Sequence, residues 1–155
     1  MSGIPIYAGG EQTGLPMRQA ISALQEKMAT MESAADQCVL KHHFAPGCYA
    51  RELTMPKGLL IIGKIHRHSH LNIISKGKVS VVTEFGTMHM EAPCTFVSEV
   101  GTKRVVYTEE ETVWTTIHPT EETDLEKIEA YVIAPSYKEI GLIDSCKTEQ
   151  IEVKK

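Results

Sequence analysis

The sequence predicts a mainly β domain, either a sandwich or a closed barrel, preceded by a helix and followed by a short helical segment. About eight short apolar segments follow one another between residues 38 and 118, and Gly or Pro turn signals separate them. The chain has 155 residues, which suits one compact domain and is short for two. Apolar residues make up 42% and charged residues 23% of the chain, as is usual in globular proteins.

Residues 1–36 are expected to form an arm and one helix. The first 15 residues are rich in Gly and Pro and have no periodicity, which is typical of an extended arm. Pro16 suits the first turn of a helix. Apolar residues then recur at spacings of four and three, at Met17, Ile21, Leu24, Met28 and Met31. This heptad pattern allows two interpretations, a helix packed on the barrel or a helical bundle at an oligomer axis.

The β domain is expected over residues 37–122. Strands are predicted over residues 38–43, 49–54, 59–66, 70–84, 87–90, 95–99, 103–108 and 113–118. The long segment 70–84 is interrupted by Lys76-Gly77, which predicts a hairpin turn.

Residues 123–155 are expected to form a short helix and a tail. Thr123, with Glu126 three residues later, predicts a capping box for a helix through about Val132, and Pro135 ends it. The residues from Cys146 onward alternate in charge and are expected to be loosely held.

Charge and cysteine content exclude several classes of function. The net charge of −4 argues against nonspecific binding to nucleic acid or to an anionic membrane. No apolar stretch is long enough for a transmembrane helix, and the first ten residues do not resemble a signal peptide, so a cytoplasmic location is expected. The four cysteines form no CxxC pair, so they are expected to be free thiols.

The densest chemical signal is the histidine cluster His66, His68 and His70. Alternate residues of a strand share a face, so the three imidazoles are expected to point the same way. Histidine is a common ligand of transition metals, and we favour a ligand role for at least two of the three. The alternative is a polar strand or turn in which these histidines bond only to their neighbours.

His118 is the best distant partner for this cluster. It ends a predicted strand on the face that also carries Trp114 and Thr116. A ligand from a separate strand is what an open metal site needs. His42 and His43 lie on opposite faces of an early strand, so only one of them can point inward.

The run from Gly63 to Val82 resembles the first motif of the cupin superfamily, in which an HxH pair and an acidic residue precede a hairpin glycine. Aligning Gly77 with that glycine places His70 at the acidic ligand, His66 at the second histidine and Lys64 at the first. A second register, with His66 and His68 as the HxH pair and Asn72 at the acidic position, loses the fit to the glycine. The segment Pro93–Arg104 resembles the second motif, with Gly101 at its glycine and Arg104 at its histidine position.

The resemblance covers about residues 49–120 and implies a cupin-type jelly-roll barrel. Phrases such as Lys41–Gly47 and Gly101–Arg104 are also similar to small cupin-like proteins encoded by tailed bacteriophages. This resemblance implies a metal at His66 and His70, to which the residue analysis adds His118 and, with a weaker case, His68. The expected cofactor is a divalent ion, namely zinc, iron, nickel or manganese.

Basic residues are expected around the barrel mouth and define the ligand. Lys64, Lys103 and Arg104 favour an anionic or hydroxyl-rich small molecule. Trp114 is expected in the core or lining the barrel, and Glu99 and Tyr107 are candidate proton-transfer groups.

Two other functions fit the same sequence. The chain could be a non-catalytic structural or accessory protein of a phage, located in the virion or the host cytoplasm, or a binder that sequesters a signalling molecule. A dimer or trimer is expected in either case, because cupins often pair or form trimers and the heptad helix suits both.

Overall fold

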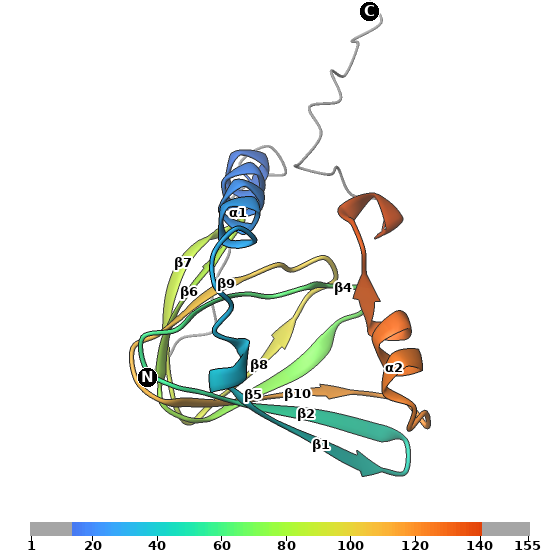
Figure 1. Ribbon diagram of the computed structural model, residues 1–155. Helices are drawn as coiled ribbons and strands as arrows, with labels where there is room; N and C mark the ends of the chain where they lie inside the picture. The colour runs from blue at the N-terminus through green and yellow to red at the C-terminus, as the bar shows by residue number, and fades with distance from the viewer. Residues whose placement is uncertain (1–13, 141–155) are drawn as a thin grey trace, which may run out of the picture.

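The structure, a computed structural model, describes residues 14–140 as an antiparallel β-barrel with helices outside it (Figure 1). The helical elements are α1 (Gly14–Met28), η1 (Ala35–Gln37), α2 (Leu125–Val132) and η2 (Tyr137–Ile140). The strands are β1 (Val39–Ala45), β2 (Cys48–Met55), β3 (Leu60–Ile62), β4 (Ile65–His66), β5 (His70–Lys76), β6 (Lys78–Thr83), β7 (Gly86–Glu91), β8 (Cys94–Ser98), β9 (Val105–Thr108), β10 (Thr112–His118) and β11 (Ile133–Ala134). The prediction of a mainly β domain flanked by helical segments is confirmed.

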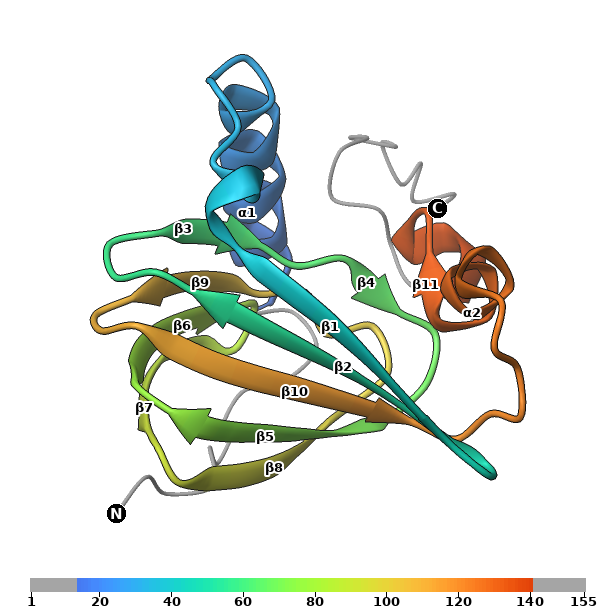
Figure 2. The same cartoon turned by 60° about the horizontal axis from the view of Figure 1, so that its bottom comes forward.

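Two sheets form the walls of the barrel. The larger sheet has the strand order β1-β2-β10-β5-β8, and Figure 2 shows these strands side by side. The smaller sheet has the order β3-β9-β6-β7, and a separate two-stranded pairing joins β4 to β11. All pairs are antiparallel. Apart from the pairs β1-β2 and β6-β7, neighbouring strands in each sheet come from distant parts of the sequence, as in jelly-roll barrels.

The core lies between the two sheets and follows from strand alternation. In β6 successive side chains point to opposite faces, so Val79, Val81 and Thr83 are buried and the residues between them are half-buried. Their side chains meet those of the larger sheet in one apolar cluster of seven buried residues, Met55, Ile74, Val79, Val81, Met90, Val106 and Trp114.

One predicted strand is divided in a way that matters for the site. The expected strand 59–66 separates into β3 and β4, with Gly63 and Lys64 between them. The backbone N–H of Gly63 still donates to the carbonyl of Arg104 at 2.8 Å, which keeps the connection against the smaller sheet. The chain then leaves this sheet, and β4 pairs with β11. Ile65 and His66 are thereby positioned next to the C-terminal segment.

The N-terminal helix α1 packs on the barrel of its own chain through part of its heptad face. Ile21 is buried, Met17, Leu24 and Met28 are half-buried, and Arg18 forms an ion pair with Glu84 after β6. Met31, the last residue of the heptad pattern, lies beyond the end of the helix and is 64% exposed. The predicted role of this helix in an oligomer stays a prediction.

The C-terminal helix α2 closes one side of the barrel near β4 (Figures 1 and 2). Ile128 and Val132 are buried against Tyr49 of β2. The predicted capping box at Thr123 is wrong by one residue, because the carboxylate of Asp124 accepts from the backbone N–H groups of Glu126 and Lys127. A carboxylate at this position also suits the positive end of the helix dipole.

Across residues 14–140, no helix combines the length and the apolar character that crossing a membrane demands.

Candidate functional site

The inner face of the larger sheet carries three rows of side chains that run across its strands. Cross-strand pairing builds a first row from His42, Arg51, Thr116, Asn72 and Phe96. Two residues further along each strand, about 7 Å away, a second row contains Phe44, Tyr49, His118, His70 and Ser98. On the other side of the first row lies an apolar row of Leu40, Leu53, Trp114, Ile74 and Cys94. Alternation along the strands therefore places a polar band beside an apolar one.

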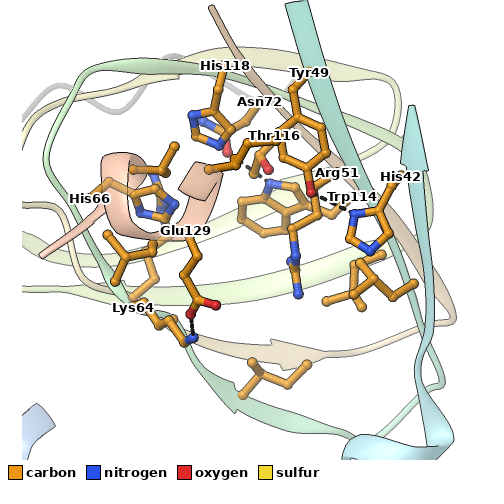
Figure 3. Close-up of a pocket in the computed structure, with 18 of the residues that line it drawn as sticks. His42, Tyr49, Arg51, Lys64, His66, Asn72, Trp114, Thr116, His118 and Glu129 are labelled. Atoms are coloured by element: carbon orange, nitrogen blue, oxygen red, sulfur yellow. Dashed lines mark hydrogen bonds and ion pairs between the residues drawn. The ribbon is translucent and has the colours of Figure 1, made fainter. Parts of the chain in front are cut away.

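A cavity of about 510 Å³ opens between this face, the β3–β4 segment and helix α2 (Figure 3). This volume is in the range of sites that hold small organic ligands. Its polar lining residues are His42, Tyr49, Arg51, Lys64, His66, Asn72, Arg104, Thr116, His118 and Glu129. The structure thus gathers titratable side chains from β1, β2, β4, β10 and α2 around one space.

Three histidines form a cluster at one end of this cavity, where His66 and His118 are lining residues and His70 is not. The ring centroids of His66 and His70 are 4.2 Å apart, those of His70 and His118 are 4.8 Å apart, and those of His66 and His118 are 5.7 Å apart. His66 comes from β4, His70 begins β5, and His118 ends β10. The structure therefore brings together the two histidines that the hairpin alignment selected and the one that strand alternation added.

Burial keeps these imidazoles neutral. Desolvation, followed by the charges of neighbouring groups, lowers the pKa of His66 to about 3 and that of His118 to about 4. Desolvation also lowers the pKa of His70. At neutral pH all three rings therefore carry a free lone pair, which is the form that binds metals.

Two nitrogens of the cluster lack a hydrogen-bond partner. The Nδ1–H of His70 donates to the carbonyl of His68 at 3.3 Å, so its Nε2 carries the lone pair. That Nε2 and the Nδ1 of His66 are buried, and neither has a partner among the described residues. Buried polar atoms are seldom left unpaired, so we expect a water molecule, an ion or a ligand atom to bond to these two nitrogens.

The number and the neutral state of the three histidines suit a metal ion, but their arrangement does not. With metal–nitrogen distances of about 2.0–2.1 Å, two imidazoles on one ion have ring centroids roughly 5 Å apart. The orientation of the rings differs, because those of His66 and His118 are nearly parallel, with an interplanar angle of 11°. No group of three or more His, Cys, Asp or Glu side chains in the described part of the chain is arranged to hold a metal. Binding one requires the rings to rotate toward a common point.

His68 lies apart from this cluster. The predicted common face of His66, His68 and His70 required one continuous strand, but the backbone bends between β4 and β5. His68 is exposed as a result, and its ring packs against that of Tyr131 at 4.6 Å. The side-by-side arrangement of all three histidines was therefore wrong.

Arg104 and Trp114 line the cavity and belong to a buried polar network. Arg104 donates to the Ser98 hydroxyl, and its guanidinium lies 5.7 Å from the centre of the Trp114 ring. Asn72 donates to the same hydroxyl at 2.6 Å and accepts from the Trp114 indole N–H at 3.0 Å. Side chains at the second-motif position thus support the cavity floor.

The other predicted ligand-binding residues divide between the mouth and the outer surface. Lys64 lies at the mouth and forms an ion pair with Glu129 of α2 (Figure 3). Lys103 bonds instead to Gln25 of α1. Glu99 is exposed and accepts from Ser69, and Tyr107 is exposed on β9. None of these last three lines the cavity. The structure therefore does not bring Lys103 to the mouth, and the roles expected of Glu99 and Tyr107 stay predictions.

Sequence reasoning missed three polar groups of the site. Arg51 and Tyr49 lie on the same face of β2. Because Tyr49 pairs with His118 across the sheet, strand alternation starting from Tyr49 would have identified both residues. The Tyr49 hydroxyl and the Nδ1 of His42 are 2.7 Å apart, which shows that His42 is the inward member of its pair. Glu129 had no local signal, because its position depends on how α2 docks.

No protein-family model and no curated protein matches this chain. Its fold is similar to that of a variant of salicylate 1,2-dioxygenase from Pseudoaminobacter salicylatoxidans, with a TM-score of 0.52 and 11% identity over 76% of this chain and 36% of that one. Other similar structures are KdgF from Halomonas sp. (TM-score 0.48, 16% identity, 59% and 86% covered) and a cupin-2 domain protein from Shewanella frigidimarina (TM-score 0.45, 10% identity, 63% and 92% covered). At these identities the likeness concerns the fold alone. The predicted cupin-type jelly-roll barrel is confirmed as the fold of this chain.

Proposed function

We propose that this chain binds an anionic small molecule in its cavity, next to a divalent metal ion held by His66, His70 and His118. The observation that carries the proposal is the pair of buried nitrogens, His66 Nδ1 and His70 Nε2, that have no partner among the described residues. They belong to a cluster of three neutral imidazoles, two of which, His66 and His118, line a cavity of about 510 Å³.

The metal would be zinc, iron, nickel or manganese, since imidazole suits several of these ions. Three neutral ligands would leave its full positive charge in place. When bound, such an ion supplies Lewis acidity or lowers the pKa of a water molecule.

The charges of the cavity favour a negatively charged ligand. Arg51, Lys64 and Arg104 line it, and Glu129, which is paired with Lys64, is the one carboxylate among its lining residues. Glu129 neutralises one of these three positive charges, so the lining keeps a net charge of +2. Arginine binds carboxylates and phosphates with two parallel hydrogen bonds, which gives such a site affinity and orientation.

Elemental analysis of the full chain, purified without a tag, tests the metal part of this proposal. We expect about one equivalent of one divalent metal, either retained from expression or taken up after dialysis against it. Separate variants His66→Ala, His70→Ala and His118→Ala should each lose it. Because histidine loss can unfold a core, circular dichroism must first show native spectra.

His89→Ala is the matched control, since His89 is exposed on β7 and lies outside the cavity lining. It should retain the metal of the native chain. Absence of metal from a folded native chain, after exposure to zinc, iron, nickel and manganese, would overturn the metal site.

The scaffold role that the sequence also allows, as a phage structural protein or an oligomeric accessory protein, stays a prediction.

A further inference from the structure

Arg51 differs from Lys64 and Arg104, the other cations of the cavity, in donating no hydrogen bond to any side chain that the structure describes. Its side chain extends from β2 into the cavity (Figure 3), and it forms no hydrogen bond or ion pair within residues 17–140. By contrast, Lys64 is paired with Glu129, and Arg104 donates to the Ser98 hydroxyl. Arg51 therefore keeps a half-buried positive charge whose hydrogen-bond donors are available to a ligand.

The position of Arg51 places its charge near the centre of the site. In the sheet it pairs with His42 on one side and Thr116 on the other, and both line the cavity. Its charge helps to lower the pKa of His118 on one wall and of Glu129 on the opposite wall. A charged ligand in the middle of the cavity would therefore interact electrostatically with Arg51.

The rest of the wall is mostly apolar. Aliphatic side chains surround the polar band, namely Leu40, Leu53, Met55, Ile61, Ile62, Val106, Leu125, Ile128, Val132 and Ile133. Leu40 and Leu125 remain 43% and 42% exposed, so the empty cavity leaves apolar surface in contact with water. A sugar acid would need hydrogen-bond partners on every side, and these apolar side chains offer it none. An apolar body would cover these side chains at a gain in free energy.

We propose that Arg51 binds the carboxylate of an amphipathic monoanion, an aliphatic or aromatic carboxylate, whose apolar body lies against Leu40, Leu125 and their neighbours. This inference deepens the proposed function and rests on the cavity being its binding site. It does not depend on the metal. Among anionic and hydroxyl-rich ligands, it selects those with one charge and an apolar body.

The geometry of the guanidinium sets the expected specificity. Two parallel N–H donors match the two oxygens of a carboxylate, and lysine provides only a point charge. Arg51→Lys should therefore keep part of the affinity, and Arg51→Gln should lose the charge-dependent part.

Trp114 provides the measurement, because it is the single tryptophan of the chain and lines the cavity. The full chain is titrated with octanoate while Trp114 fluorescence is followed, and calorimetry checks the affinities. Three comparison compounds separate the contributions: octanamide lacks the charge, acetate lacks the body, and glucuronate replaces the body with hydroxyl groups. We expect octanoate to bind at least tenfold more tightly than each of them.

Variants then assign the charge recognition to Arg51. Arg51→Gln should raise the Kd of octanoate at least tenfold and change that of octanamide less than twofold. Arg51→Lys should fall between the native chain and Arg51→Gln, and it keeps the test valid if the glutamine variant does not fold. Lys57→Gln is the control, since it removes one positive charge from an exposed turn outside the cavity. It should bind octanoate like the native chain.

Each outcome separates this inference from the proposed metal site. If the native chain takes up metal but binds octanoate no better than octanamide or glucuronate, the Arg51 inference is overturned and the metal site stands. Equal octanoate binding by Arg51→Gln and the native chain also overturns it. Octanoate binding that depends on Arg51, in a chain without metal, supports the inference and overturns the metal site. If the native chain neither takes up metal nor binds octanoate, both the metal site and the Arg51 inference are overturned.

Discussion

The indole N–H of Trp114 donates to the Asn72 side-chain carbonyl at 3.0 Å, inside the barrel where Asn72 is fully buried. The Asn72 amide donates in turn to the Ser98 hydroxyl at 2.6 Å, which also accepts from Arg104. Asn72 and Trp114 sit in neighbouring rows of the inner sheet face, the polar row and the apolar row. Their hydrogen bond therefore joins the cavity floor to the apolar core.

Asn72→Leu should destabilise the chain by about 1–3 kcal/mol, because it keeps a similar shape and leaves the indole N–H of Trp114 buried without a partner. Urea unfolding followed by Trp114 fluorescence measures this change. Thr95→Ala is the control, since Thr95 is exposed on the neighbouring strand β8. It should change the free energy of unfolding by less than about 0.5 kcal/mol. An Asn72→Leu variant as stable as the native chain would contradict the role given to this bond.

The stability of the chain should fall as the pH falls below about 6.5. Burial lowers the folded-state pKa of His66 to about 3 and of His118 to about 4, and it also lowers that of His70. An unfolded imidazole has a pKa near 6.5, so between these values the unfolded chain binds more protons than the folded one. The free energy of unfolding therefore rises with pH across this window, by at most about 1.4 kcal/mol per pH unit for each imidazole. Urea unfolding at pH 7.5, 6.0 and 5.0 measures the slope.

His66→Gln should reduce that slope, whereas His89→Gln should leave it unchanged because His89 is exposed on β7. A stability that is flat between pH 5.0 and 7.5 would show that the folded chain accommodates charged imidazoles at the cavity.

The sequence contains most of the information that locates the histidine cluster. Gly77, at a φ of +94°, does occupy the turn between β5 and β6, and counting back from it selects His66 and His70. The predicted hairpin is wrong, because β5 and β6 belong to different sheets and do not pair. Strand alternation alone puts His118 on the face of Trp114 and Thr116, and all three line the cavity. These predictions succeed because turn position and strand period are local properties of the chain.

The remainder of the site depends on packing that no local pattern encodes. Glu129 faces the cavity because α2 folds back over the barrel and pairs its carboxylate with Lys64. His68 turns outward because β4 leaves its sheet to pair with β11, which breaks the strand period between His66 and His70. Lys103 turns to α1 for the same kind of reason, since it bonds to Gln25, 78 residues earlier.

Asp124→Ala should destabilise the chain by about 0.5–2 kcal/mol, the usual effect of removing a helix N-cap. The Asp124 carboxylate accepts from two backbone N–H groups of α2, whose other residues form one wall of the cavity. Thermal unfolding measures the effect, and Thr123→Ala is the matched control one residue earlier. If Thr123→Ala costs more than Asp124→Ala, the cap lies at Thr123 and α2 begins one residue sooner.

Gly77→Ala should cost more stability than Gly58→Ala, although both glycines have a positive φ, of +94° and +80°. A non-glycine residue in this region costs about 1–2 kcal/mol in either position. A Cβ at Gly58 would meet nothing within 4 Å. At Gly77 it would approach the Glu111 carbonyl oxygen and come within 2.5 Å of the Thr112 hydroxyl and 2.7 Å of the Thr112 Cα, at the start of β10.

Two of those three atoms belong to the backbone, so the backbone of the barrel has to shift to admit Gly77→Ala. We expect this variant to lower the free energy of unfolding by about 2 kcal/mol or more beyond the loss in Gly58→Ala. Urea unfolding of the two variants measures this difference directly. Equal costs would mean that only the turn conformation requires glycine at position 77. The larger cost would mean that this glycine also allows the turn between β5 and β6 to pack against the start of β10, the strand that ends at His118. In that case Gly77 is linked to the histidine cluster in two ways. It lies at a fixed spacing from His66 and His70 along the chain, and it packs against β10, which carries His118.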